Sequence, residues 1–472
     1  MNPWQMDAPQ VKNVSMIRRS LSVCLLVLTV VPCAVTAQNL PGSKKEVAQF
    51  VRYNSKTIVL EHVRVIDGTG AAQKENQTIV ISDGRIASIS NTPPAAIPSD
   101  ATRLNLEGRT VVPGLVMLHE HMFYFSGFRV WHSQAVSYPR LYLAAGVTTL
   151  RTAGTDVPYT DLNLKLAIDE GRIAGPKMFV TGPFFNGYEG HFLGDNIVRT
   201  EADARRGVAY WAGEGVTSFK VYANISLDAL KGVVEEAHAR GLKVTGHLDS
   251  VSCRDAATLG IDNVEHSFVS CAKEIGLVDP KTGDVSPPNE VKARELIRFL
   301  IEKRVVLTST PSAVDRPISK EELDMLHPTA RGQYLNRMKS VPAFMTATQP
   351  YVRKLEREFV AAGGHLVVGS DPQDFGMIAG YADHHALELL VEAGWKPLDV
   401  IRIATLGGAE FLGVADDRGS ISVGKAADLI VINGNPAADM KDIEKVELVF
   451  KDGVAYDPVL LRASVKGLIG WH

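Results

Sequence analysis

The sequence has almost no excess of charge of one sign. Its 50 Lys and Arg side chains nearly balance 53 Asp and Glu, which leaves a formal net charge of −3. No basic stripe marks a nucleic-acid surface, and no long block of like charge marks an interaction tail. The apolar segment at residues 21–31 is shorter than the roughly 20 residues that cross a bilayer. We therefore expect no nucleic-acid partner and no membrane span.

A biased composition is also absent. The chain has 45% hydrophobic and 22% charged residues, with 40 Gly and 24 Pro, which is ordinary for a folded protein with many loops. These values exclude a disordered, collagen-like or coiled-coil chain. Its 472 residues are enough for one large domain and a smaller one.

The N-terminal segment is typical of a secretory signal peptide. Arg18 and Arg19 precede the apolar residues 21–31, and a stretch of small residues ends at Ala37. A basic region, a short apolar core and a small-residue cleavage site make such a signal. We expect residues 1–37 to be removed and the mature protein to be periplasmic or secreted.

The leader and the cysteines leave alternatives open. Residues 1–15 are interpreted as a spurious upstream extension, with Met16 as the start. A short buried helix or a lipid anchor at Cys33 are the alternatives to cleavage. After cleavage, Cys253 and Cys271 either form a disulfide or remain as two buried thiols.

The hydrophobic pattern divides the chain into two β-rich ends and an alternating middle. Residues 57–90 and 419–456 contain short strand-like runs with Asp-Gly turns. In the middle, amphipathic helical patterns alternate with apolar runs, and one helix is predicted from its N-cap Ser226 to near Gly241. The apolar runs are Val111–Leu118, Val147–Leu150, Met178–Val180, Ser218–Tyr222, Val244–His247, Val264–Phe268, Val305–Thr308 and Leu366–Gly369.

This alternation predicts the α/β class with a (β/α)8 TIM-like barrel. We expect the barrel at residues 109–413 and a small β-sandwich-like domain formed by both chain ends, from residues 38–108 and 414–472. A doubly wound sheet is the alternative, because periodicity alone does not close a barrel.

Side chains that bind metals stand at the ends of several predicted strands. His119 and His121 end the first run, and strand residues two apart point the same way, so both imidazoles face one side while Glu120 faces the other. In a barrel that side is the mouth, where such enzymes place their sites. Later runs end with the same kind of residue: Lys220, His247, His266 and Asp371.

In a closed barrel these six residues would converge on one small volume. Four His, one Lys and one Asp would repel or remain unsatisfied there without a cation, and they suit one or two divalent metals. Each residue alone has an ordinary structural explanation, so the prediction of a metal site depends on their joint occurrence.

Several sequence motifs resemble those of the metal-dependent amidohydrolase superfamily. Residues 112–121 are similar to its Pro-Gly-Leu-Ile-Asp-x-His-x-His signature, although Met117 stands where Asp is usual. Residues 145–151 and 260–266 resemble its second and sixth strands, but Thr152 replaces another common Asp. The similarity covers about residues 57–456 and is greatest to the imidazolonepropionase-like and Xaa-Pro or Xaa-Arg dipeptidase branch.

The resemblance implies a binuclear metal centre. Lys220, as a carbamate formed with carbon dioxide, would bridge the metals, and a salt-bridging Lys220 in a mononuclear site is the alternative. Zinc suits these ligands, with Mn, Fe, Co or Ni as alternatives. Asp371 would take a proton from the activated water and deliver it to the leaving amine. The ligands divide into His119, His121 and Asp371 on one metal, and His247 and His266 on the other.

The implied activity is hydrolysis of the amide C–N bond of a small molecule by an exported enzyme. A dipeptide or N-acyl amino acid is the expected substrate; a cyclic amide, a carbamate or a xenobiotic amide is the alternative, and a non-catalytic binding protein is a third hypothesis. The substrate-binding candidates are His191, Tyr222 and Arg151, whose structural alternatives are a solvated loop, strand packing and an ion pair. Homo-oligomerisation stays open.

Overall fold

The computed structural model describes most of the chain after the leader. The described residues belong to one compact unit within residues 41–472, and the predicted leader at 1–37 lies outside them. Within this part of the chain, no helix is both long and apolar enough to cross a membrane. The described ranges are 44–92, 97–125, 131–188, 193–311, 318–339, 341–373 and 377–470.

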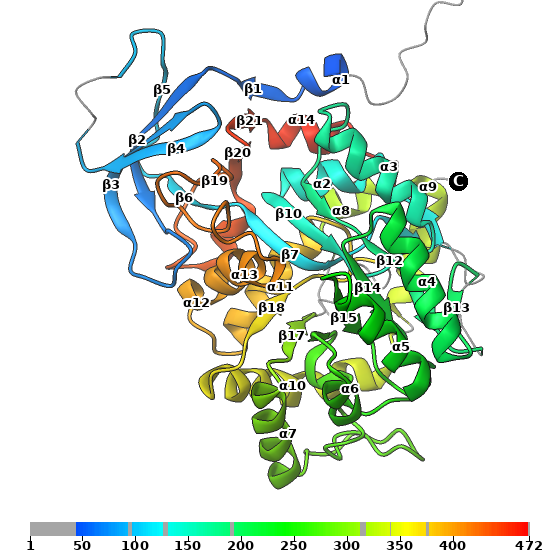
Figure 1. Cartoon of the computed structure of the whole chain (residues 1–472). Helices are drawn as coiled ribbons and strands as arrows, with labels where there is room; N and C mark the ends of the chain where they lie inside the picture. Colours follow the sequence, from blue (N-terminus) through cyan, green and yellow to red (C-terminus); the bar gives the residue numbers. More distant parts are fainter. Residues whose placement is uncertain are drawn as a thin grey trace, which may run out of the picture. The chain divides into compact units, whose positions relative to one another are not determined.

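Strands from both ends of the described chain form one nine-stranded sheet (Figure 1). Its order is β1-β21-β20-β19-β6-β2-β3-β4, with β5 paired to β2. The two ends meet where β6 pairs antiparallel with β19. The strands are β1 (Val51–Tyr53), β2 (Thr57–Val65), β3 (Lys74–Ser82), β4 (Arg85–Ser90), β5 (Thr102–Asn105), β6 (Thr110–Pro113), β19 (Leu429–Ile432), β20 (Val446–Lys451) and β21 (Val454–Tyr456).

This sheet has a hydrophobic core of its own. Ile58 and Val111 from the N-terminal strands pack in it with Leu429 and Phe450 from the C-terminal strands, and all four are fully buried. β-Branched and aromatic side chains favour such strand positions because they fill a pleated, half-buried surface. The apolar faces of both chain ends are therefore buried together.

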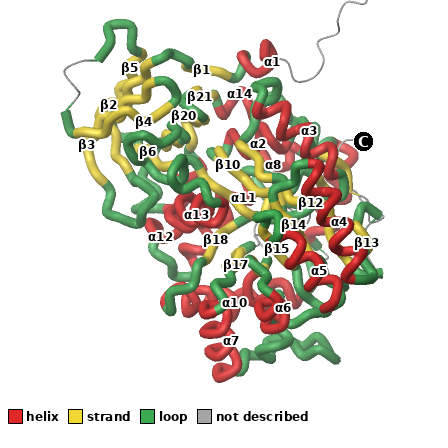
Figure 2. The backbone as a smooth tube through the Cα atoms, viewed as in Figure 1, coloured by secondary structure: helices red, strands yellow, loops and turns green. Residues whose placement is uncertain are grey.

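The two larger sheets of the middle region are parallel, whereas β8 (Phe123–Phe125) and β9 (Trp131–Ser133) form a separate antiparallel pair. One sheet has the order β11-β10-β7, and the other has the order β13-β12-β14-β15-β16-β17-β18. In Figure 2 helices surround these strands. The strands are β7 (Leu115–Glu120), β10 (Val147–Thr152), β11 (Lys177–Phe179), β12 (Thr181–Asn186), β13 (Asn196–Ile197), β14 (Ser218–Val221), β15 (Lys243–Gly246), β16 (Asn263–Val264), β17 (Val306–Ser309) and β18 (Leu366–Val368).

Two short connections link these parallel sheets. Only Val180 separates β11 from β12, and the Asp371 N–H donates to the His119 carbonyl over 3.0 Å, which joins the chain after β18 to the end of β7. The ladders themselves form two sheets and not one closed ring. The carboxyl ends of the strands within each parallel sheet lie at one edge.

The first predicted apolar run is two strands. Its first half is β6 of the nine-stranded sheet, and its second half is β7 of a parallel sheet, with Gly114 between them. A Cβ at Gly114 would lie 2.1 Å from Thr148 Oγ1, so only glycine allows β7 to approach β10 this closely. The hydrophobic pattern is continuous because both halves are buried.

The predicted helix after Ser226 is α5 (Leu227–His238). The Ser226 side chain accepts a hydrogen bond from the Ala229 N–H over 3.2 Å, as an N-cap does. The helix buries its apolar face but leaves Leu227 48% exposed. It ends before Gly241, whose φ of +70° is left-handed.

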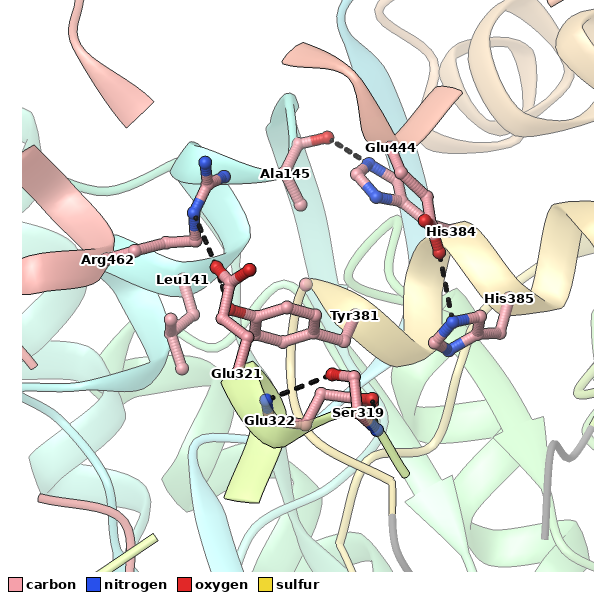
Figure 3. A pocket seen from close by; sticks show the side chains of 11 residues that line it. Leu141, Ala145, Ser319, Glu321, Glu322, Tyr381, His384, His385, Glu444 and Arg462 are labelled. Atoms are coloured by element: carbon pink, nitrogen blue, oxygen red, sulfur yellow. Dashed lines mark hydrogen bonds and ion pairs between the residues drawn. The ribbon is translucent and has the colours of Figure 1, made fainter. Parts of the chain in front are cut away.

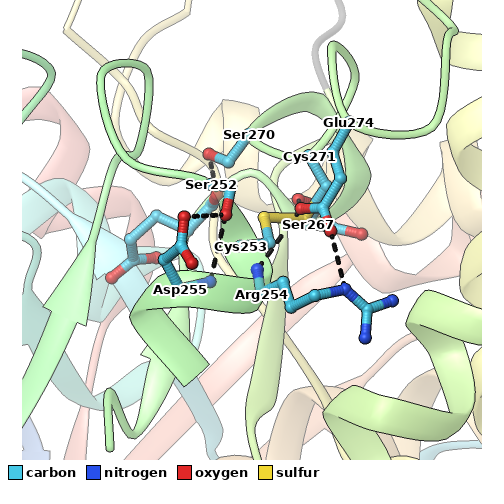
Figure 4. Close-up of a disulfide and its surroundings, with 9 residues drawn as sticks. Ser252, Cys253, Arg254, Asp255, Ser267, Ser270, Cys271 and Glu274 are labelled. Atoms are coloured by element: carbon cyan, nitrogen blue, oxygen red, sulfur yellow. Dashed lines mark hydrogen bonds and ion pairs between the residues drawn. A yellow bond between two sulfur atoms is a disulfide. The ribbon is translucent and has the colours of Figure 1, made fainter. Parts of the chain in front are cut away.

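Cys253 and Cys271 form a disulfide, which resolves the open alternative (Figure 4). Cys253 begins α6 (Cys253–Leu259), and Cys271 follows the short helix η1 (Ser267–Val269). The bridge therefore encloses β16 and the chain just after it, where His266 lies.

Candidate active site

One cavity gathers all six residues predicted to bind metal. It has a volume of about 260 Å³ and is lined also by Tyr222. The six come from the carboxyl ends of the parallel strands, where residues far apart in sequence meet. They are His119, His121, Lys220, His247, His266 and Asp371.

Strand alternation positions the first two histidines. His119 is the second-last residue of β7, and His121 directly follows the strand. Both side chains therefore point to the cavity, and they are 1% and 2% exposed. Glu120 points the other way, as predicted. It accepts hydrogen bonds from Ser370 N and Ser370 Oγ, over 2.9 and 2.8 Å, and thereby holds the residue next to Asp371. Glu120 thus supports the segment that carries Asp371. Met117, which stands where the resembled signature usually has Asp, is packed in the hydrophobic core.

Asp371 is the carboxylate that lines the cavity beside the imidazoles. Its Oδ1 lies 3.1 Å from His121 Nε2 and 3.6 Å from His119 Nε2, and its Oδ2 lies 4.0 Å from His266 Nδ1. The ring centroid of His266 is 4.6 Å from those of both His119 and His247. The four rings and one carboxylate therefore form a single cluster.

Hydrogen bonds on the far side of two rings fix which nitrogen faces Asp371. His121 Nδ1 donates to the Gly154 carbonyl over 3.2 Å, and His119 Nδ1 lies 2.7 Å from Glu265 Oε2. A carbonyl or carboxylate accepts, so each Nδ1 carries the proton and each Nε2 has its lone pair free for a cation. A partner of this kind is typical of metal-binding histidines.

The backbone is strained at this cluster. His266, Ser267 and Asp371 have φ of 58°, 52° and 52°, the left-handed region that side chains other than glycine avoid. Strain of this sort is found at functional sites, where the surrounding structure maintains it. The predicted strand at Val264–Phe268 is wrong beyond Val264, because this turn redirects the chain and aims His266 into the cavity.

Burial sets the charge of the cluster. It lowers the pKa of Lys220 to about 8 and that of His247 to about 4, because a charged form is poorly solvated there. Burial by itself would raise the pKa of Asp371, but contacts with His119 and His121 hold it below its usual range. At neutral pH the cavity thus contains an ionised Asp371, a neutral His247 and a Lys220 that ionises close to that pH.

Glu265 is a site residue that the sequence reasoning missed. Its Oε1 lies 2.5 Å from Arg151 Nη2, and its Oε2 contacts His119, with both charged groups almost fully buried. Thr245 Oγ1 also donates to Glu265. A charged residue inside the apolar run before His266 is the signal that could have identified it.

Arg151 corrects a prediction. Its guanidinium forms the buried pair with Glu265, and its Nε donates to the Leu118 carbonyl over 2.8 Å. It is 1% exposed and does not belong to the cavity lining. Arg151 therefore has the structural role that was the alternative to substrate binding.

The other two substrate-binding candidates differ. Tyr222 lies in the cavity wall, with its ring centroid 4.9 Å from His247 and 4.9 Å from Phe184. His191 lies outside the described residues.

Thr152, which replaces an Asp of the resembled pattern, accepts a hydrogen bond from Thr181 N over 2.9 Å and joins neighbouring strands.

The rest of the described cavity wall combines apolar side chains with polar ones, the latter being Thr310, Thr348, Gln349, Ser370 and Gln373. Part of it comes from α10 (Ala343–Ala361), whose first turns contribute Phe344 and Met345. No sequence pattern pointed to this helix, because it is amphipathic like the others. The apolar lining side chains are Phe184, Val269, Phe344, Met345 and Met377.

Two known proteins are similar to parts of this sequence. An enamidase from Eubacterium barkeri is 26% identical over 221 residues, 44% of this chain and 54% of the enamidase. An imidazolonepropionase from Mycolicibacterium smegmatis (strain ATCC 700084 / mc(2)155) is 39% identical over 90 residues, 19% of this chain and 22% of that protein. The chain thus matches about half or less of the length of these relatives.

Solved structures extend the likeness over most of the chain. A Xaa-Pro dipeptidase with bound methionine has a TM-score of 0.66 at 21% identity, over 85% of this chain and 100% of that one. Phenylurea hydrolase B has a TM-score of 0.68 at 21% identity, over 88% and 100%. Neighbours of this type imply a TIM-like barrel for the parallel strands. The amidohydrolase family model matches residues 110–455, and the chain belongs to the amidohydrolase family.

Proposed function

We propose that this protein hydrolyses the C–N bond of small-molecule amides with the help of divalent metals. The observation that carries the proposal is the convergence of four imidazoles, a lysine and an ionised carboxylate on one cavity of about 260 Å³. Three of the proteins named above, an enamidase, a Xaa-Pro dipeptidase and a phenylurea hydrolase, have names that refer to an amide, a dipeptide and a urea, which supports the same reaction class.

The donor set fits two metals. His119, His121 and Asp371 each offer one atom, all within 4.8 Å of one another. We assign the first metal to them, the second to His247 and His266, and a bridging carbamate to Lys220. The lowered pKa of Lys220, about 8, makes the neutral amine accessible, and carbamate formation requires that form. Imidazole and carboxylate donors suit zinc.

Asp371 performs the proton transfers. Metals bound there would lower the pKa of a water molecule and polarise the scissile carbonyl. The ionised Asp371 accepts a proton as the water oxygen bonds to the carbonyl carbon. It then passes this proton to the amide nitrogen, so that the C–N bond breaks and a neutral amine leaves.

A dipeptide or an N-acyl amino acid is the first candidate substrate, by analogy with the dipeptidase-like branch. A second candidate is a neutral cyclic amide, carbamate or xenobiotic amide. The apolar side chains of the described wall, among them Phe184, Phe344 and Met377, favour this second class, because apolar surface binds neutral groups at little desolvation cost.

A substrate panel tests the proposal and separates the candidates. Purified protein, loaded with Zn²⁺, is assayed on Xaa-Pro, Xaa-Arg and N-acyl amino acids, and on cyclic amides, carbamates and phenylureas. Asp371→Asn is the control. It should bind metal, at most modestly weakened, and lose at least about 10²-fold of kcat, the lower range for removing a general acid–base group. Unchanged turnover in that variant would refute the role of Asp371, and activity on cyclic amides alone would remove the dipeptidase candidate.

We also propose that the mature protein is exported and has two domains. The Cys253–Cys271 disulfide supports export, because disulfides persist in oxidising compartments. The separate core of the nine-stranded sheet supports a small domain from residues 38–108 and 414–472 around a barrel at 109–413. Fractionation of the host cell and N-terminal sequencing of the product test the export and the cleavage near Ala37.

A further inference from the structure

A second group of metal-binding side chains lies outside the catalytic cavity. His385 and Glu388 on α11 (Tyr381–Glu392) and Glu444, the last residue of η3 (Met440–Glu444), each offer one ligand atom, all within 4.8 Å of one another. His385 and Glu388 are three positions apart, so they share one face of the helix. His385 Nε2 lies 3.2 Å from Glu444 Oε1 (Figure 3).

This group is at the opposite end of the parallel strands from the catalytic cluster. His384, beside it, contacts the Ala145 carbonyl through Nε2 over 2.7 Å. Ala145 precedes β10, whereas the catalytic residues follow the carboxyl ends of the strands. A strand of this length spans roughly 20 Å, so the two groups of ligands are separate sites.

The charges in the group favour a cation. The Glu444 carboxylate contacts the His385 imidazole, and Glu388 lies within hydrogen-bond reach of the same carboxylate. Two carboxyl groups in contact require a proton or a cation between them. The neighbouring Glu321 already has positive and donor partners, Arg462 at 3.3 Å and Tyr381 Oη at 2.8 Å.

A route for an ion to enter is present. His385 and Glu444 line a pocket of about 270 Å³. The His385 side chain is only 7% exposed, whereas that of Glu444 is 50% exposed. The buried imidazole is thus held in place, and the carboxylate faces the pocket opening.

We propose that His385, Glu388 and Glu444 form a second site for a transition-metal ion of the Zn²⁺ type. One nitrogen and two oxygen ligands leave a fourth, tetrahedral position for water, and the imidazole favours such an ion over Ca²⁺ or Mg²⁺. The ion ties α11, which follows the Asp371 segment, to η3, which leads into β20 of the nine-stranded sheet. It therefore links the parallel-strand region to that sheet.

Metal counting tests this site apart from the catalytic one. The full-length mature protein and the variants Glu388→Gln and His385→Ala are stripped of metal, reloaded with Zn²⁺ and analysed by elemental analysis and calorimetry. We expect each variant to bind one Zn²⁺ fewer per chain, or to bind it at least about 10-fold more weakly, with hydrolytic activity unchanged. Glu392→Gln, one turn along the same helix, is the matched control and should bind as the wild type does.

Two further measurements do not depend on the variants. Zn²⁺ added to the wild type beyond the catalytic equivalents should raise Tm by a few degrees, because an ion that binds only the folded state stabilises it. Anomalous diffraction at the zinc edge should show a peak between the three side chains. Equal Zn²⁺ stoichiometry and affinity in wild type and variants, or no peak at this position, would overturn the proposal.

Discussion

At the scale of single residues, Glu265 connects the buried framework to the candidate metal site. One carboxylate oxygen holds Arg151 and the other holds His119. Burial opposes the charge of Glu265, but Arg151 and His119 keep its pKa well below the usual range. The carboxylate is therefore ionised, and it can orient the ring of His119 and increase the basicity of its Nε2.

We expect Glu265→Gln to weaken metal binding at His119 by about 10–100-fold, because an outer carboxylate partner of a ligating histidine has this effect. Arg151→Gln is the matched control. Both variants break the buried ion pair and should lose about 3–5 kcal/mol of unfolding free energy, but only Glu265→Gln replaces the charged acceptor of His119 by a neutral amide. Metal titration followed by kcat and KM measurements distinguishes them. Equal loss of metal affinity in both variants would show that Glu265 acts only through the buried ion pair and not through His119.

At the scale of elements, the disulfide secures the segment that carries His266. Cys253 and Cys271 are 18 positions apart, and the chain between them contains α6, β16 and the two left-handed residues at 266 and 267. The bridge restricts the unfolded chain and keeps this strained turn beside α6.

Replacing both cysteines by alanine should lower the free energy of unfolding by about 3 kcal/mol, as expected for closing a loop of this size. Urea unfolding of the wild type, with and without reductant, provides the comparison. The double variant is the control, and its midpoint should not respond to reductant. Two titratable thiols in the native, unreduced protein from which residues 1–37 have been removed would contradict this assignment.

At the scale of the whole molecule, buried acids make stability depend on pH. Burial raises the pKa of Glu356, on α10, from its ordinary value of 4.5 to about 7. Between these values the folded state binds more protons than the unfolded state, so this group's stabilising contribution is complete below about 4.5 and is lost as pH rises through about 7.

Glu356→Gln should remove this part of the pH dependence. Relative to wild type, the variant should gain on the order of 2–3 kcal/mol of unfolding free energy between pH 5 and pH 8, since one pKa shift of this size has that value. Glu358→Gln, whose carboxylate is 41% exposed on the same helix, is the control. Parallel stability curves for wild type and Glu356→Gln across this range would show that Glu356 ionises normally.

Local patterns were sufficient for the elements and for the ligand candidates. The helix after Ser226 follows from its cap and apolar spacing, and six strand-end residues were identifiable because each ends an apolar run. The residues that support the site were harder to identify. In the sequence, Glu265 and Arg151 cannot be distinguished from any other charged residue in a strand. Phe344 belongs to a helix with no distinguishing pattern.

Local sequence patterns predict the α/β class, the amphipathic elements and six candidate ligands at strand ends, because periodicity and capping act over a few residues. The division of Val111–Leu118 at Gly114, the pairing of Arg151 with Glu265 and the Cys253–Cys271 bond are seen only in the folded chain. These outcomes depend on contacts between residues far apart in the chain, where packing and burial, and not local preference, set the free energy.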